Sequence, residues 1–293
     1  MTASSSSSYY FQHSTVPWIE KLRFALRQAY FERGKVSPLW LLLSQSRLDV
    51  APQLICKAME APQRLFYDWR YSYAERVQAL TDHYTFVMDS LPEGVARSLL
   101  GLRTCVVFEQ EGKSGSAYQL RLGVDHQMEK EGALTLDLLC QGQSVTRCTW
   151  HFARLPSSQW VIRIGGLQST NIDTQQQIKQ ATRDFHGIQP RILMLQAVRA
   201  VAQALGVQRI EAVGGAWHIY SSRRYRKAIG SDYDQLWTFL GLQPLSDGHF
   251  ATDTHIPIKD LQDCPSHKRS EYRRRNDCLL SLQEQVAKAL KYS

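Results

Sequence analysis

The chain has 293 residues, of which 43% are hydrophobic and 21% are charged, and its formal net charge at pH 7 is +8. This is ordinary globular composition with enough apolar residues for a sizeable core, in one large domain or two modest ones. The positive charge permits an anionic partner (nucleic acid, a membrane surface or a phosphorylated small molecule) without choosing among them.

The cysteines and the hydropathy pattern exclude other classes. The six cysteines form no CxxC pair and no His or Cys lies at zinc spacing, so we expect reduced thiols and no metal site. The N-terminus lacks the basic and apolar regions of a secretory signal. The longest candidate membrane segment, residues 39–43, is far shorter than the ~20 residues of a spanning helix. We expect a cytoplasmic protein without a transmembrane segment, able to lie at the surface of the inner membrane.

The N-terminus combines a serine-rich tail with an amphipathic helix. Residues 1–15 are expected to be disordered because serine dominates them. Trp18, Leu22 and Leu26 then recur at helical spacing. We interpret the aromatic residues of this region as part of the core.

The first hundred residues are predicted to be mainly helical, with further helices at residues 52–60 and 72–88. No linker separates them from the rest of the chain. We therefore expect residues 16–293 to form one domain, in which the helical part, residues 16–100, packs on a sheet-and-helix core.

Short β-strands are predicted after residue 102. Apolar and β-branched runs indicate two hairpins and a fifth strand, at residues 105–108 with 118–124, 134–139 with 145–152, and 160–164. Five short strands in succession predict an antiparallel meander.

A strand–helix–strand unit over residues 160–218 organises the predicted fold. Its first strand ends or bends at Gly165-Gly166, and a helix is expected at residues 172–185 with Asn171 or Asp173 as its cap.

The same unit continues after a helix break at His186-Gly187. Pro190 suits the first turn of a second helix, because its fixed φ fits there and its missing N–H is not needed. Gly206 ends that helix and a short strand follows at residues 208–213. A helical crossover between two strands favours parallel pairing.

The C-terminal part carries two basic clusters, at residues 223–227 and 268–275. A short helix capped by Ser231 or Asp232 lies between them, and a last helix ends at Leu290. The whole pattern predicts an α+β protein: a helical N-terminal part packed on a mixed, mostly antiparallel sheet with a strand–helix–strand crossover, and a helical C-terminus.

Several separated motifs resemble one bacterial family. They are ATRDFHGIQPR (181–191), the strand ending at Trp217-His218, SDYD (231–234) and HKRSEYRRR (267–275). In this order they resemble the VirK/YbjX family over residues 20 to 290. The resemblance implies a role in virulence, envelope integrity or resistance to antimicrobial peptides, and it implies no defined reaction.

The order of elements is also similar to the GCN5-related N-acetyltransferase architecture. In that fold a helix N-terminus holds the pyrophosphate of coenzyme A. This sequence departs from it, because an extra helix separates Gly166 from Pro190 and the usual glycine-rich loop is absent. The likeness is an analogy and does not establish chemistry.

Under the acyltransferase hypothesis, an acyl-thioester donor such as coenzyme A binds at His186, Gly187, Gln189 and Arg191. Backbone N–H groups at a helix start attract anions, whereas a cation there opposes the helix dipole unless an anion is bound. The alternatives are a solvated Arg191 and a His186 that caps the preceding helix through its side chain.

Three residues are candidates for catalysis in the same hypothesis. His218 follows the second strand of the crossover and could act as a general base. Glu211 lies within that strand, and Tyr220 could assist as a general acid. The alternatives are a structural His218 and a solvent-facing Glu211.

A non-catalytic protein remains the competing hypothesis. The clusters at 223–227 and 268–275 would then contact an anionic membrane surface or a protein partner, or they are solvated faces. Nucleic-acid binding is the least favoured choice, because no recognised motif accompanies the basic residues.

Overall fold

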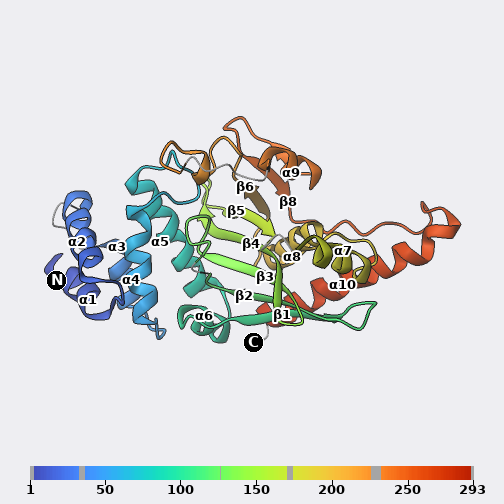
Figure 1. The fold of residues 1–293 in the computed structure, drawn as a ribbon, viewed down its shortest axis with the longest axis horizontal. Coiled ribbons are helices and arrows are strands. Elements are labelled where there is room, and N and C mark those ends of the chain that lie inside the picture. Colours follow the sequence, from blue (N-terminus) through green and yellow to red (C-terminus); the bar gives the residue numbers. More distant parts are fainter. Residues whose placement is uncertain (1–2, 33–36, 126, 170–173, 226–231, 292–293) are drawn as a thin grey trace.

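The computed structural model describes residues 3–32, 37–125, 127–169, 174–225 and 232–291. Within them, six α-helices precede the first strand in the sequence (Figure 1). Four more lie between later strands or after the last one. The six are α1 (Ala3–His13), α2 (Trp18–Glu32), α3 (Pro38–Ser44), α4 (Pro52–Glu60), α5 (Tyr73–Ser90) and α6 (Glu93–Leu100). The four are α7 (Thr174–Asp184), α8 (Pro190–Ala204), α9 (Tyr233–Phe239) and α10 (Arg269–Lys291).

One mixed sheet of eight strands forms the centre, in the order β1-β2-β3-β4-β5-β6-β8-β7. The strands are β1 (Cys105–Glu111), β2 (Ala117–Gly123), β3 (Leu134–Cys140), β4 (Gln143–Arg154), β5 (Trp160–Ser169), β6 (Arg209–Ala212), β7 (Gln243–Pro244) and β8 (Phe250–Asp253). β5 and β6 pair in parallel, and the other neighbours pair antiparallel. The predicted α+β class, with its mostly antiparallel sheet and its crossover, is confirmed.

The two faces of the sheet differ in polarity because side chains alternate along each strand. On β4, Cys148, Trp150 and Phe152 share one buried face, and Thr149 and His151 share the other. The apolar face meets α8, which contacts β3, β4 and β6, and α10 packs against α8 and β1. The functional side chains lie on the other face.

Helix α5 protects an open edge of the sheet. β4 continues past the start of β3, which pairs with it only as far as Trp150. Beyond that point the Phe152 N–H donates to Nδ1 of His83 (3.3 Å), and the Arg154 N–H donates to Asp82 (3.3 Å). Burial lowers the pKa of His83 to about 3, so its ring stays neutral and can accept this bond.

The N-terminal segment differs from the expectation. In place of a disordered tail, residues 3–13 form α1, which packs on α2. The Tyr10 ring stacks on Phe24 with centroids 3.7 Å apart, and Gln28 donates to Ser6 (2.9 Å). The interpretation of Trp18 as core is also wrong, since this side chain is 72% exposed.

The crossover follows the prediction closely. His186 (φ 54°) and Gly187 (φ 87°) break the chain between α7 and α8, and α8 begins at Pro190. Asp232 caps α9 by accepting from the Gln235 N–H (3.1 Å). The other proposed caps, Asn171, Asp173 and Ser231, lie outside the described residues.

Gly165 and Gly166 bend β5 without ending it. The register with β4 shifts at this point, where Thr149 pairs with Gly166 and Trp150 pairs with Ile164. A Cβ atom on Gly165 would lie 1.7 Å from the carbonyl oxygen of Glu131, and one on Gly166 would lie 2.0 Å from the Glu131 carboxylate. Position 165 therefore needs glycine, because the Glu131 backbone rests directly on the strand, whereas at position 166 the close atoms are the end of the Glu131 side chain.

Candidate functional site

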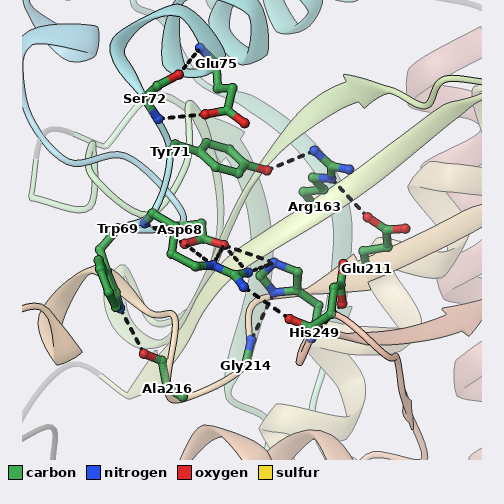
Figure 2. A network of polar contacts seen from close by, with 12 residues as sticks. Asp68, Trp69, Tyr71, Ser72, Glu75, Arg163, Glu211, Gly214, Ala216 and His249 are labelled. Atoms are coloured by element: carbon green, nitrogen blue, oxygen red, sulfur yellow. Dashed lines mark hydrogen bonds and ion pairs between the residues drawn. The ribbon is translucent and has the colours of Figure 1, made fainter.

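A polar cleft of about 420 Å³ opens over the part of the sheet formed by β4 and β5. One wall is the segment of residues 68–82, which enters α5 and of which Figure 2 shows Asp68, Tyr71 and Glu75. The other walls come from the C-terminal end of β4 and from the turn before β8. The lining residues are Asp68, Arg70, Tyr71, Glu75, Gln78, Ala79, Asp82, Ala153, Arg154, Arg163, Asp247 and His249.

Strand register sets the floor of this cleft. Arg163 on β5 pairs with Glu211 on the parallel strand β6, so both side chains project from the same face. Arg163 Nε donates to Glu211 Oε2 (3.0 Å), and Arg163 Nη1 donates to the hydroxyl of Tyr71 (3.0 Å). Arg209 also donates to Glu211 (2.9 Å). Glu211 is thus a buried acceptor between two guanidinium groups and does not face solvent.

The floor presents hydrogen-bond donors to the cleft. The Tyr71 oxygen accepts from Arg163, which leaves the Tyr71 O–H free to donate elsewhere. Burial raises the pKa of Tyr71, so the hydroxyl keeps its proton. Burial disfavours the charged form of Arg163, but Tyr71, Tyr67 and Glu211 outweigh that effect and raise its pKa. A cation and a neutral O–H donor therefore lie side by side.

A second group of hydrogen bonds, centred on Asp68, holds the wall of residues 68–82 against the sheet. Asp68 is buried and accepts from the backbone N–H of Arg70 (2.8 Å), from the Arg70 guanidinium (2.6 Å at Nη2) and from Nε2 of His249 (3.1 Å). Nδ1 of His249 accepts from the Gly214 N–H (3.3 Å), which places the ring proton on Nε2, toward Asp68. Both ring nitrogens are occupied, so His249 positions Asp68 and is not a free base.

Arg70 and Trp69 of the same wall also contact residues far later in the sequence. Arg70 donates to the carbonyl of Asp247 (3.3 Å) and lies over the Trp217 ring (3.8 Å to its centroid). The Trp69 indole donates to the carbonyl of Ala216 (2.9 Å), as Figure 2 shows. Burial alone would raise the pKa of Asp68, but the bonds from His249 and Arg70 prevail and lower it.

The side chains of His151 and Tyr67 lie behind the cleft, and their polar atoms have no hydrogen-bond partners among the described residues. Both are buried, and their rings are 4.8 Å apart. Burial, reinforced by Arg163 and His83, holds the pKa of His151 well below its usual range. His151 is therefore a neutral ring at neutral pH.

The predicted catalytic residues do not form one centre. His218 is fully buried, with Nε2 2.9 Å from the Gly165 carbonyl oxygen and 3.4 Å from Glu131 Oε1. The Tyr220 ring lies 5.3 Å from that of His218. Glu211 shares no hydrogen bond or ring contact with either within the described chain, and it belongs to the floor of the cleft.

Glu131 completes the buried cluster around His218. It accepts from Gln168 (2.6 Å), and its second carboxylate oxygen has no partner among the described residues. Burial raises the pKa of Glu131 against the opposing effect of His218. The His218 ring also stacks on Tyr233 with centroids 4.5 Å apart. These contacts favour the structural alternative for His218.

The predicted donor-binding residues do lie together at the start of α8. The His186 carbonyl accepts from Arg275 Nε of α10 (2.6 Å), and a Cβ on Gly187 would lie 2.3 Å from Arg275 Nη2. His186 ends α7 through its backbone N–H, which donates to the Arg183 carbonyl (3.2 Å), so the predicted side-chain cap is replaced by a backbone one. Gln189 precedes α8 without a side-chain cap bond, and Arg191 is half-buried in its first turn.

Cations gather at this turn. Burial lowers the pKa of His186, and the charges of Arg274, Lys113 and Arg275 lower it further.

No group of three metal-ligating side chains occurs in the described ranges. No helix among the described residues has the length and apolarity needed to cross a bilayer.

The sequence pointed to Glu211, which accepts a hydrogen bond from Arg163 at the floor of the cleft, but not to the residues that line the cleft. A signal existed for Arg163, since oppositely charged residues interrupt two neighbouring apolar strands at 163 and 211. No comparable signal links Asp68 to His249, because 181 positions separate them and neither belongs to a motif.

These features define an α+β protein with a mixed sheet, a helical crossover and a polar cleft on the sheet. The chain belongs to the family described as "Protein of unknown function (DUF535)", which matches residues 17–288. It is 28% identical over 276 residues to "Uncharacterized protein YbjX" of Escherichia coli K12, covering 90% of this chain and 83% of YbjX. The resemblance to the VirK/YbjX family is confirmed.

Two further proteins are similar to the chain. "Membrane protein LapB" of Mannheimia haemolytica is 24% identical over 198 residues, covering 65% of this chain and 81% of LapB. The solved structure of a cAMP-binding acyltransferase from Mycobacterium smegmatis shares 9% identity at a TM-score of 0.31. That match covers 64% of this chain and 56% of the acyltransferase, so the chain spans little more than half of that enzyme.

Proposed function

We propose that this chain is an envelope-linked bacterial protein that binds a small zwitterionic molecule in the polar cleft. The ligand would carry a carboxylate and an ammonium group, as an amino acid or a short peptide does. The observation that carries the proposal is the arrangement of Arg163 and Tyr71 as adjacent donors below a rim of carboxylates.

The donors suit a carboxylate. Arg163 uses Nε and Nη1 for internal bonds, and its Nη2 makes no hydrogen bond to the described residues. Together with the free Tyr71 O–H it would give an oxyanion two donors, one of them charged.

The rim suits an ammonium group. Glu75 and Asp82 line the same cleft, and neither forms an ion pair within the described parts of the chain. Glu75 accepts from the Ser72 N–H (2.7 Å), and Asp82 accepts from Gln78 (2.7 Å) and from the Arg154 N–H. Arg70 and Arg154 line the same cleft, so it carries charges of both signs, and a zwitterion complements both of them.

Tyr71→Phe tests this site with little change in packing. The variant loses one donor to a charged group, so we expect binding of amino acids and dipeptides to weaken about tenfold or more. Titration calorimetry with a panel of amino acids, dipeptides, acetate and methylamine measures the effect. Tyr73→Phe is the matched control, since its hydroxyl donates to Glu32 outside the cleft. Equal affinity in Tyr71→Phe and the wild type, or no binding by any panel member, would refute the proposal.

The envelope link is part of the proposal. Its support is the membership of the family and the name of the Mannheimia haemolytica relative. Virulence, envelope integrity and resistance to antimicrobial peptides are the processes that the family resemblance implies, and a cytoplasmic position at the inner membrane fits them.

A second candidate function is acyl transfer from a thioester donor at the start of α8. The cations Lys113, Arg274 and Arg275 around His186 support it, since they would complement a diphosphate. At about 100 times its dissociation constant, coenzyme A should stabilise the fold by about 2.7 kcal/mol. We expect a rise in melting temperature that Arg191→Ala diminishes and Arg103→Ala, an exposed control, preserves. Unchanged melting with coenzyme A and acetyl-coenzyme A would dismiss this candidate.

A further inference from the structure

Helix α2 exposes its apolar side chains to solvent. Trp18 is 72% exposed, Leu26 is 63% exposed and Tyr30 is 78% exposed, and Ile19 and Leu22 are exposed as well. Isolated apolar residues on a surface are common, but these five belong to one helix. Nothing in the described chain covers them.

The exposed residues form one continuous face. At 100° per residue, Trp18, Leu22, Leu26, Ile19 and Tyr30 follow one another within an arc of about 120°. The opposite side is the one that packs on α1, where Phe24 stacks on Tyr10 and Gln28 bonds to Ser6. The helix is thus attached through a narrow buried side, and its wide apolar side points away from the protein.

Cations border the apolar face on one side, where Arg23 and Arg27 follow Tyr30 around the helix. On the other side, Glu32 and Lys21 lie between Trp18 and the part of the helix that packs on α1. Arg27 forms no ion pair within the described residues, Arg23 pairs with Glu20 (2.5 Å), and Lys21 donates to the Phe11 carbonyl (2.7 Å). Phe11 of α1 is exposed as well.

We propose that α2 lies in the interface of an anionic membrane, with its apolar face among the acyl chains and its cations at the headgroups. A wide apolar face with Trp and Tyr at its ends and basic residues along a border is the pattern of an in-plane amphipathic helix. The overall charge of +8 adds a long-range attraction to the same surface. Figure 1 places α1 and α2 at one end of the molecule, away from the sheet, so a flat bilayer can approach them.

Vesicle sedimentation tests this docking surface in the full chain. We expect binding to vesicles of phosphatidylglycerol and phosphatidylcholine, and at least tenfold weaker binding to pure phosphatidylcholine. The variant Trp18→Gln, Leu22→Gln, Leu26→Gln should bind the anionic vesicles at least tenfold more weakly. Its melting temperature should stay close to that of the wild type, because all three side chains are exposed. Arg23→Gln with Arg27→Gln should reduce binding about fivefold per cation.

Two matched controls separate this surface from others. Phe239→Gln with Leu280→Gln removes exposed apolar residues elsewhere and should leave binding unchanged. Arg273→Gln with Arg274→Gln removes cations of α10, and a loss of binding in this variant alone would move the membrane contact to the basic cluster at 268–275.

Retained binding in the α2 triple variant would overturn the proposal. So would a dimer of the wild type that the triple variant abolishes, because a second copy would then cover the face. Ligand binding in the cleft is a separate property and should persist in the triple variant.

Discussion

Gly165→Ala is expected to destabilise the fold by about 3 kcal/mol or more. The added methyl would lie 1.7 Å from the carbonyl oxygen of Glu131, which is backbone and cannot rotate away. Relief requires the Glu131 loop to lift from β5. That movement would also separate the Glu131 carboxylate from Gln168 and His218, which bury it. Urea denaturation of the variant and the wild type measures the loss.

Gly206→Ala is the control for Gly165→Ala. Gly206 has nothing within 4 Å of the position of a Cβ atom, and its φ of 71° is the source of strain in the variant. A left-handed conformation costs a non-glycine residue about 1–2 kcal/mol. A loss at Gly165 no larger than that at Gly206 would contradict the close approach of Glu131.

Asp68→Ala is expected to cost about 3 kcal/mol at neutral pH, at the lower end of the range for breaking a buried ion pair. The variant leaves the buried His249 ring and the Arg70 guanidinium without their acceptor. Arg70 is partly exposed and can turn to water, which keeps the loss near the lower limit. Asp49→Ala is the control, because that aspartate is fully exposed and its pairing with Arg97 contributes little.

The cost of Asp68→Ala should depend on pH. The pKa of Asp68 in the folded chain lies below its ordinary value of 3.8, so the folded state binds this proton less readily than the unfolded state. The stabilisation is therefore complete above that ordinary value and is lost progressively as the pH falls from it through the lower pKa of the folded state. Denaturation at pH 7 and near pH 3 should show a smaller difference between variant and wild type at the lower pH. An unchanged difference would mean that the Asp68 charge is not what the variant removes.

Much of the fold could be predicted because local signals agreed with the tertiary structure. Pro190, the pair His186-Gly187 and the apolar runs of the strands each act within a few residues, and the structure keeps their effects. Helix α2 shows where such signals fail. The periodicity of Trp18, Leu22 and Leu26 predicts a helix correctly, but periodicity does not say whether the apolar face meets protein or solvent.

The surroundings of the candidate site residues were less predictable than the fold. His218 stood out as a histidine after a buried strand, yet its hydrogen bond to the Gly165 carbonyl depends on a bend whose closeness to Glu131 no pattern reveals. Asp68 and His249 meet only after the helical part and the turn before β8 have both reached the sheet. Sites assembled by long-range pairing leave little trace in sequence spacing.

The contact of α5 with β4 has a consequence for assembly. An exposed strand edge is a template on which a strand of another chain can add. Along the end of β4, His83 and Asp82 occupy the N–H groups that an incoming strand would use. The helix thereby guards the molecule against edge-to-edge aggregation.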